Sequence, residues 1–452
     1  MAAAADLKVL VVGGGGREHA LCWKIAASPL VREVLCAPGN AGTGLVARNV
    51  EVQPGDLEAL VDLSRSERVD LVVVGPEDPL CAGLADRLRD AGLLVFGPGA
   101  DGARLEGSKL FSKEFLTRHK IPTATWRRFD RSGAAKAYLE GCAQWPQVIK
   151  ADGLAAGKGV FVVDSVREGW GVVDALMEER RLGEAGAQVV IEECLSGDEC
   201  SVLALTDGAT LCLLEPVMDH KQVGEGDSGP NTGGMGVYSP VGLLGRRVLR
   251  QIEQHVLLPS LDGLRREGIA YRGVLFVGLM LTAQGPRVLE YNCRFGDPEA
   301  QACLRRMTSD LVPYLLATAR GKLEELEAPQ WDPRTCVGVV AASEGYPGRY
   351  RTGDVIDGLD EANRVPEVVV FHAGTRLVGP PLGERQVQTA GGRVLCVTAL
   401  GDDLEGARAR AYEAYDRIRW DGKFCRRDIG LERRHRAEEP LQAQAWRRSE
   451  RR

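Results

Sequence analysis

A segment rich in lysine and glycine offers the clearest chemistry in the sequence. It covers residues 150–159, where Lys150 ends an apolar run and Gly157 and Lys158 lie in a turn that enters another apolar run. Glycines let backbone N–H groups close on phosphate oxygens, and lysines supply the compensating charge. No Ser or Thr follows Lys158, and a strand rather than a helix is expected next, so the segment is not a Walker motif. It predicts a clamp for nucleotide phosphates, with a plain hairpin turn as the alternative.

An apolar run that becomes acidic follows further along the chain. Residues 189–191 are apolar, and Glu192 and Glu193 come directly after them. The edge of such a strand offers backbone carbonyl and N–H groups to an adenine, and a following carboxylate can hold ribose hydroxyls. Glu199 is the candidate for the ribose contact. By itself, the segment would also fit a solvated strand end.

A third segment alternates acidic, amide and basic side chains. Glu290, Asn292 and Arg294 follow one another at every second position, which places them on one face of a strand. Carboxylate and amide oxygens suit a Mg²⁺ ion that bridges nucleotide phosphates. Arg294 could neutralise charge on a transferring phosphoryl group or hold a substrate carboxylate. The segment predicts a metal site beside an arginine, although a salt-bridged strand would show the same pattern.

A glycine-rich loop lies between the second segment and the third. It follows Asp219, His220 and Lys221, and its richest part is residues 229–236. This composition suits a loop that closes over reacting groups and excludes water, and it suits a flexible linker equally well. His220 could act as a general base, but a single histidine is more often a structural hydrogen-bonding group.

The first part of the chain must supply a parallel sheet that presents ligand-binding loops. Short apolar runs alternate there with helical stretches, as a sheet with helices on its faces requires. The expected strands are 9–12, 34–36, 71–74 and 93–96, and the loops after the first three are 13–16, 38–43 and 75–77. Ligands bind at the carboxyl ends of strands in open parallel sheets, so these loops form a candidate binding edge.

The rest of the chain must hold the lysine and carboxylate segments against one another. A helix at 108–119, capped by Ser108, leads into a small α+β lid, and mixed elements to about residue 320 form the catalytic sheet. The further expected strands are 147–150, 160–163, 274–281, 287–291, 337–341, 367–371 and 394–398, and the expected helices are 166–181, 246–264, 299–319 and 403–419. The predicted domains are 1–107, 108–330 with a lid at about 124–195, and 331–430, followed by a disordered basic tail at 431–452.

Composition excludes several classes of protein. The chain has 452 residues, of which 44% are hydrophobic and 27% are charged, as in a soluble protein of several domains. A net charge of -6 gives no general basic field for nucleic acid. The N-terminus lacks the features of a signal peptide, and no apolar run is long enough to span a membrane, so we expect a cytosolic protein with neither kind of partner. The 12 cysteines include no Cys-x-x-Cys pair and are expected to be reduced.

Taken together and in this order, the motifs resemble those of the glycinamide ribonucleotide synthetases, which are phosphoribosylamine–glycine ligases of the ATP-grasp superfamily. The likeness extends over almost the whole chain to about Gly430. Its motifs are residues 12–19, 37–43, 75–77, 150–159, 219–221, 230–236, 292–299, 372–375, 391–395 and 427–430. The resemblance implies an α/β multidomain protein with a Rossmann-like parallel-sheet domain, an ATP-grasp fold and a C-terminal mixed α+β domain.

The resemblance also implies an activity. ATP would phosphorylate the carboxylate of glycine, and the amine of 5-phosphoribosylamine would attack the resulting acyl phosphate, in the second step of purine nucleotide synthesis. ATP and Mg²⁺ are the implied cofactors, with Mn²⁺ as a substitute metal. The implied protein is a cytosolic monomer that could associate with other enzymes of the pathway.

The roles of individual residues follow from the same resemblance. The implied nucleotide contacts are Lys109, Lys150, Gly157, Lys158, Glu192, Glu193, Cys194, Leu195, Glu199, Asn231 and Leu289. The implied metal ligands are Glu290 and Asn292. The implied substrate contacts are Gly15, Gly16, Asn40, Glu77, Asp219, Arg294, Gly296 and Asp297. Asp219 and Arg294 would also be catalytic, together with Lys158.

Two features depart from the wider superfamily pattern. Many members carry a further acidic metal ligand on the strand before the Glu-x-Asn strand, but residues 274–281 contain no carboxylate. The tail at 432–452 resembles neither of the domains that are fused to animal versions. A free-standing enzyme and a short product of a longer gene both fit this ending.

Other functions compete with this one. An NAD-dependent oxidoreductase would need glycine where Glu18 stands, and it would leave the lysine segment unexplained. Another ligase of the superfamily would share the nucleotide residues but not the motifs at 219–221 and 230–236. A non-catalytic role disagrees with the intact metal and phosphate residues, and the basic tail lacks the interleaved aromatics of an RNA-binding segment apart from Trp446.

Overall fold

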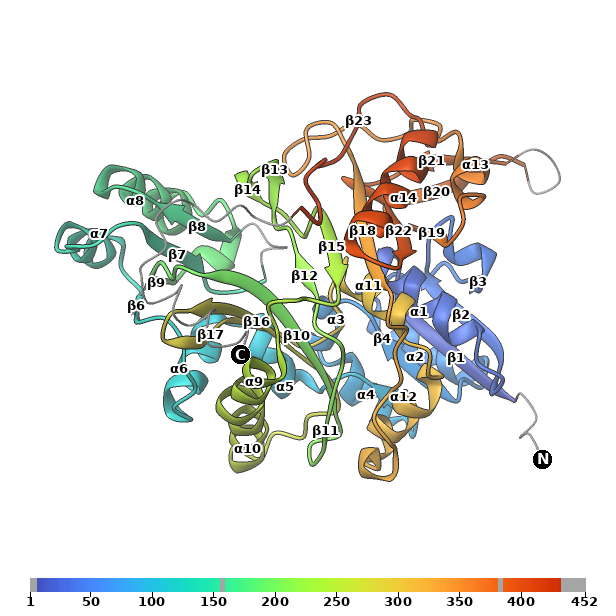
Figure 1. The fold of residues 1–452 in the computed structure, drawn as a ribbon. Helices are drawn as coiled ribbons and strands as arrows, with labels where there is room; N and C mark the ends of the chain where they lie inside the picture. The colour runs from blue at the N-terminus through green and yellow to red at the C-terminus, as the bar shows by residue number, and fades with distance from the viewer. Residues whose placement is uncertain (1–5, 155–158, 381–384, 432–452) are drawn as a thin grey trace.

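The computed structural model describes residues 6–154, 159–380 and 385–431. The ribbon has an N-terminal region in blue, a lid in teal, a central region in green to yellow and a C-terminal region in orange to red (Figure 1). In the described ranges, no helix combines the length and the apolar character that crossing a bilayer requires.

The N-terminal strands form the expected parallel sheet. The strands β1 (Leu7–Gly13), β2 (Val31–Pro38), β3 (Arg48–Asn49), β4 (Leu71–Val74) and β5 (Val95–Phe96) lie in the order β3-β2-β1-β4-β5. Their helices are α1 (Gly16–Ala26), α2 (Leu57–Ser66), α3 (Glu77–Cys81), α4 (Leu84–Asp90) and α5 (Ala100–Gly107). The strand order reverses between β1 and β4, so the loops after these two strands flank one crevice. The strand expected at 93–96 is shorter, because only its last two residues pair with β4.

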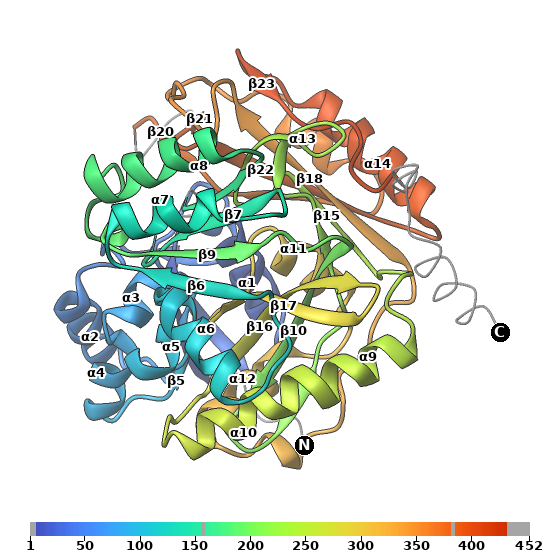
Figure 2. The same cartoon turned by 90° about the vertical axis from the view of Figure 1, so that its left-hand side faces the viewer.

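The lid is a separate antiparallel sheet with helices on one side. Its strands β6 (Trp126–Phe129), β7 (Gln147–Ala151), β8 (Val160–Val163) and β9 (Val189–Glu193) lie in the order β6-β9-β7-β8. The helices α7 (Ser132–Glu140) and α8 (Val166–Val173) pack side by side (Figure 2). A π-helical turn, Asp174–Glu178, continues α8, so the helix expected at 166–181 ends a little early. Buried Leu139, Ile149 and Val173 belong to a core of the lid's own.

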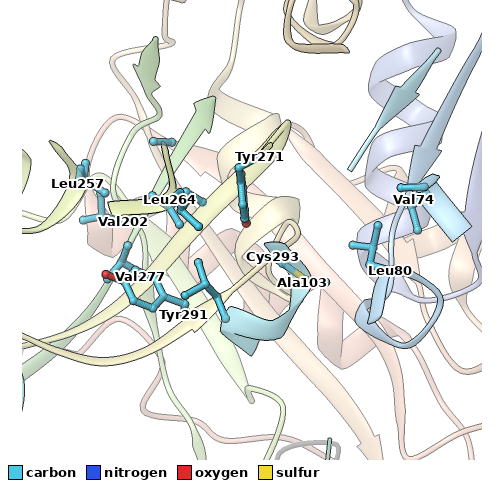
Figure 3. Packing of buried hydrophobic residues seen from close by; sticks show 14 of the residues in the cluster. Val74, Leu80, Ala103, Val202, Leu257, Leu264, Tyr271, Val277, Tyr291 and Cys293 are labelled. Atoms are coloured by element: carbon cyan, nitrogen blue, oxygen red, sulfur yellow. The ribbon is translucent and has the colours of Figure 1, made fainter. Parts of the chain in front are cut away.

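The central region joins an antiparallel sheet to the N-terminal region. Its strands β10 (Asp198–Thr206), β11 (Leu211–Leu213), β16 (Gly273–Thr282) and β17 (Gly285–Asn292) lie in the order β11-β10-β16-β17. The helices here are α6 (Lys109–Arg118), α9 (Arg246–Ile252) and α10 (Leu258–Arg266), and Ser108 caps α6 as expected. Val277 and Tyr291 from this sheet belong to the same hydrophobic cluster as Val74 and Leu80 from the N-terminal region (Figure 3). This shared core fixes the two regions relative to one another.

The C-terminal sheet crosses the expected domain boundary. Its strands β12 (Met218–Asp219), β15 (Gly236–Ser239), β18 (Thr335–Ser343), β22 (Arg393–Gly401) and β19 (Val368–His372) lie in the order β12-β15-β18-β22-β19, and β23 (Lys423–Phe424) pairs with β18. The helix α14 (Leu404–Arg417) packs on β18 and β22. The smaller elements are β13 (Gln222–Gly224), β14 (Ser228–Asn231), α13 (Leu359–Asn363), β20 (Thr375–Val378) and β21 (Gln386–Thr389). The boundary predicted at residue 330 cuts through this sheet, because β12 and β15 precede it and the other strands follow it.

The single helix predicted at 299–319 is wrong. The structure has two helices there, α11 (Glu299–Arg306) and α12 (Leu311–Arg320). Met307 leaves the helical conformation, with φ -68° and ψ 111°, and forms a bridge to Trp331. Asp310 then caps α12 by accepting a hydrogen bond from the N–H of Val312. A local capping signal and a long-range strand contact therefore interrupt an otherwise continuous apolar pattern.

Candidate active site

The glycine turn after β1 lies against the segment that follows β17. A side chain carbon at Gly15 would lie 3.1 Å from Oδ2 of Asp297, and one at Gly16 would lie 2.4 Å from Nε2 of Gln301. The N–H of Gly15 donates to Oε2 of Glu18 at 2.6 Å, and α1 begins at the next residue. Both glycines are thus required for this close approach, and the structure brings them beside Asp297.

Asn40 builds a loop rather than presenting a free amide. Its Nδ2 donates to the carbonyls of Gly14 and His372, each at 2.9 Å. Its Oδ1 accepts from the N–H groups of Gly42 and Thr43. Because both ends of the amide are already bonded, Asn40 shapes the crevice without offering a spare donor to a ligand.

Arg294 is held between two carboxylates. Its Nε lies 3.2 Å from Oε2 of Glu77, and its Nη2 lies 2.7 Å from Oε1 of Glu106. Burial alone would raise the pKa of Glu77, but Arg294 and Arg17 hold it at about 2. Burial raises the pKa of Glu106, whose other oxygen accepts from the N–H of Cys293 at 2.7 Å. The guanidinium is therefore fixed in place before any substrate arrives.

Arg393, which comes from the C-terminal sheet, forms a hydrogen bond with Asp297. Nη1 of Arg393 donates to the carbonyl of Asp297 at 2.5 Å and to the carbonyl of Gly233 at 2.6 Å. Burial alone would raise the pKa of Asp297, but Arg393 and Arg17 lower it. Arg393 therefore links the glycine-rich loop to the segment that follows β17.

A small cavity collects several of the predicted residues. It is lined by Glu199, Cys200, Ser201, Asp219, Lys221, Gly278, Leu279, Leu289 and Glu290. Nζ of Lys109 lies 3.1 Å from Oε2 of Glu290. Burial alone would raise the pKa of Glu290, but Lys109 and Lys221 hold it well below its usual value. Glu290 is thus ionised at neutral pH, as a ligand of Mg²⁺ must be.

Asp219 is a buried carboxylate with spare hydrogen-bonding capacity. Its Oδ2 accepts from Nζ of Lys221 at 3.2 Å, while its Oδ1 has no hydrogen-bond partner among the described residues. Burial raises the pKa of Asp219 above its usual value. Burial alone would lower the pKa of Lys221, but Asp219 and Glu299 raise it. One carboxylate oxygen of this cavity-lining residue therefore has no hydrogen-bond partner among the described residues.

The lid lysine reaches the central sheet. Nζ of Lys150 donates to the carbonyl of Leu289 at 3.1 Å and forms an ion pair with Glu192. The start of the 150–159 segment therefore lies against the strand that carries Glu290. The N–H of Glu193 donates to the carbonyl of Thr125 at 3.0 Å. The N–H of Glu193, one of the implied nucleotide contacts, is therefore already bonded within the fold.

Other predicted residues lie outside this arrangement or on its margin. Gly157 and Lys158 fall outside the described residues. Asn231 pairs with Gln222 and is not among the described residues that line the cavity. Cys194 is partly buried beyond β9, and Gly296 leaves room for the Glu299 carboxylate, since a side chain carbon there would lie 2.2 Å from it.

His220 behaves as a structural histidine. Its Nδ1 lies 3.5 Å from Nη2 of Arg426, and its Nε2 accepts from the N–H of Gly430 at 3.4 Å. Both contacts come from the end of the described chain, so the ring anchors that end to the 219–221 segment.

Sequence reasoning missed several side chains of the site. Glu106, Lys113 and Arg393 received no role, although each touches a residue that did. Lys113 follows Lys109 by one helical turn, which was a usable signal. The contacts of Glu106 and Arg393 join distant segments and leave no local pattern.

Fold and site together define the class of protein. A lysine-bearing lid sheet meets a central antiparallel sheet whose last strand carries Glu290 and Asn292, and a parallel-sheet domain precedes both. This is the arrangement of an ATP-grasp protein, and it agrees with the predicted fold class.

Comparisons with known proteins narrow this class to one family. Models of the phosphoribosylglycinamide synthetase N domain, ATP-grasp (A) domain and C domain match residues 7–106, 107–300 and 336–432. A phosphoribosylamine–glycine ligase of Escherichia coli O6:H1 is 50% identical over 427 residues, which cover 94% of this chain and 98% of that protein. A solved phosphoribosylamine–glycine ligase of Thermotoga maritima has a TM-score of 0.79 at 34% identity, covering 94% of this chain and 100% of that one. The chain belongs to the phosphoribosylglycinamide synthetase family, which confirms the resemblance of its motifs.

A more distant structure has the same fold. The biotin carboxylase domain of the Hydrogenobacter thermophilus 2-oxoglutarate carboxylase has a TM-score of 0.68 at 17% identity, covering 92% of this chain and 91% of that one. That domain was solved with MgADP, ADP and bicarbonate.

Proposed function

We propose that this chain is the ATP-dependent ligase that joins glycine to 5-phosphoribosylamine, forming N1-(5-phosphoribosyl)glycinamide, ADP and phosphate in the second step of purine nucleotide synthesis. The observation that carries the proposal is the cavity that Glu199, Asp219 and Glu290 share, in a chain of this family. A carboxylate is a poor electrophile until one of its oxygens can leave as phosphate. Such a ligase must therefore bind ATP and the carboxylate of its amino-acid substrate next to one another.

The reaction proceeds in two balanced steps. A carboxylate oxygen of glycine takes the γ-phosphoryl group of ATP, which gives glycyl phosphate and ADP. The amine nitrogen of phosphoribosylamine then attacks the acyl carbon, the bond from that carbon to the phosphate oxygen breaks, and the nitrogen loses a proton. Lys109 and Lys150 hold phosphate oxygens, Leu195 donates to adenine, and Glu199 accepts from ribose hydroxyls in this scheme.

The metal site rests on Glu290 and Asn292. A bound Mg²⁺ would offset the negative charge of the nucleotide phosphates. The ionised Glu290 carboxylate and the Asn292 amide, two positions along β17, are an oxygen donor set that fits this ion. Within the described ranges no group of three or more His, Cys, Asp or Glu side chains could hold a metal ion by itself. Mn²⁺ would suit the same oxygens.

Arg294, Asp219 and the turn at Gly15 and Gly16 are the parts of the site that we assign to the substrates. Arg294 binds the glycine carboxylate or the developing charge on the phosphoryl group. Oδ1 of Asp219, which has no hydrogen-bond partner among the described residues, accepts from an amine. The turn at Gly15 and Gly16, where α1 begins, faces the sugar phosphate, since backbone N–H groups at a helix start favour anions. Asp297 lies close enough to this turn to orient the ribose.

The cellular setting follows from the resemblance of the motifs. On this reading the ligase works in the cytosol as a monomer that can associate with other enzymes of the pathway. It has no need of nucleic acid or membrane.

The release of ADP tests the proposal. The protein is mixed with Mg-ATP together with glycine alone, phosphoribosylamine alone, or both. ADP should form continuously only when both substrates are present, and it should stop when the metal is chelated. Turnover without phosphoribosylamine, or with another amino acid in place of glycine, would assign the chain to a different ligase reaction.

A further inference from the structure

A second lysine, Lys113, pairs with the same carboxylate as Lys150 and has no role in the proposed reaction. Lys113 projects from α6, forms an ion pair with Glu192 and donates to Oγ1 of Thr123 at 2.7 Å. The other oxygen of the Glu192 carboxylate pairs with Lys150. One carboxylate therefore holds two ammonium groups, and only Lys150 also reaches β17.

Burial prevents Lys113 from touching a nucleotide directly. Its side chain and that of Glu192 are each only 3% exposed. Burial lowers the pKa of Lys113 to about 8, and Glu192 opposes that effect. Burial alone would raise the pKa of Glu192, but Lys150 and Lys113 lower it. Lys113 therefore acts on a ligand only indirectly, and the charged group that it contacts is Glu192.

The charge balance shows what Lys113 adds. Without it, Glu192 and Lys150 would form a closed pair, in which the carboxylate neutralises the only cation that β7 offers to phosphate. With it, two ammonium groups share one carboxylate, and one positive charge is left over. A buried carboxylate that loses one of its partners is energetically costly. Without Lys113, Glu192 would therefore hold the ammonium of Lys150 in a closer ion pair.

We infer that Lys113 is a positioning residue for the nucleotide: it offsets the charge of Glu192, so that the ammonium of Lys150 stays at the carbonyl of Leu289 and remains available to the triphosphate. This inference rests on the proposed function only in taking the nucleotide to bind beside Lys150. It does not depend on which acid or amine the enzyme joins.

Binding of Mg-ADP, measured by calorimetry without either co-substrate, tests the inference. Lys113→Met should weaken Mg-ADP binding by at least about tenfold, the usual effect of losing a charge-assisted contact. Lys113→Arg keeps the charge and should restore most of the affinity. The control is Lys136→Met, which removes a lysine of the lid that pairs with Asp174 near the surface and should leave binding unchanged.

A double variant separates this role from a merely structural one. Lys113→Met combined with Glu192→Gln removes both the buried cation and the carboxylate that it offsets, so Mg-ADP should bind more tightly than to Lys113→Met alone. Thermal unfolding checks that each variant is folded, and the arginine and double variants remain informative if the methionine variant is not. Wild-type affinity in Lys113→Met, or weaker binding in the double variant than in the single one, would overturn the inference. If the ADP-release assay fails while these binding results hold, the fault lies with the proposed substrates.

Discussion

Replacement of Gly234 by alanine tests how tightly the glycine-rich loop is packed into the site. Gly234 has φ +116°, and an added side chain carbon would lie 2.5 Å from Cδ of Pro298 and 2.6 Å from Oδ1 of Asp219. The unfavourable backbone conformation costs about 1–3 kcal/mol. Forcing a methyl group into a packed region costs a further ~1–3 kcal/mol. We expect the free energy of unfolding to fall by about 2–6 kcal/mol in total.

The same change should damage catalysis, because the loop and Asp219 must move apart to relieve the clash. We expect kcat/KM for glycine to fall by more than about tenfold, which corresponds to ~1.4 kcal/mol of lost transition-state stabilisation. Urea unfolding and ADP release measure the two effects. Gly242→Ala is the matched control, since no described atom lies within 4 Å of its added carbon. The reasoning fails if Gly234→Ala resembles the control in both stability and turnover.

Three further predictions concern single side chains. Glu290→Gln should lower turnover by roughly a hundredfold and raise the Mg²⁺ needed for half-maximal rate without unfolding the protein, and a normal ADP-release rate would contradict its role as a metal ligand. Glu77, with its pKa held at about 2 by Arg294, should contribute about 3 kcal/mol above pH 4.5 and lose that contribution as the pH falls toward 2. Urea unfolding between pH 7 and pH 3.5 should then show a steeper loss for the wild type than for Glu77→Gln, and equal slopes would refute the assignment. Ser108→Ala should lower the free energy of unfolding by about 1 kcal/mol through loss of the α6 cap and of the bond to Asp152, and an unchanged melting temperature would show that the cap adds nothing.

The sequence predicted the parts of the site that depend on short-range pattern. Strand alternation made Glu290 and Asn292 candidates, and the lysine at the end of an apolar run made Lys150 another. These positions could be predicted because glycine turns and apolar periodicity depend only on residues that are neighbours in the sequence. The contact of Lys150 with Leu289 then confirms that the two segments converge.

Features that depend on contacts between distant segments could not be found in this way. The buried pair of Lys113 with Glu192 joins α6 to β9, and Arg393 bonds mainly to backbone carbonyls, which carry no sequence signal. The break after α11 was different, because Asp310 is a capping residue that the continuous apolar pattern concealed. Asn40 illustrates a third case, in which the residue was identified but its side chain is occupied by the fold.

The strand β15 has a consequence for anyone who recombines members of this family. It pairs with β18 along Gly236–Ser239, so a strand from the middle of the chain forms part of the C-terminal sheet. A chimera that takes its last hundred or so residues from a relative would have to match a foreign β18 to the native β15, register included. Crossover points placed before β12 would carry the whole sheet together and should give better-folded hybrids than a cut at residue 330.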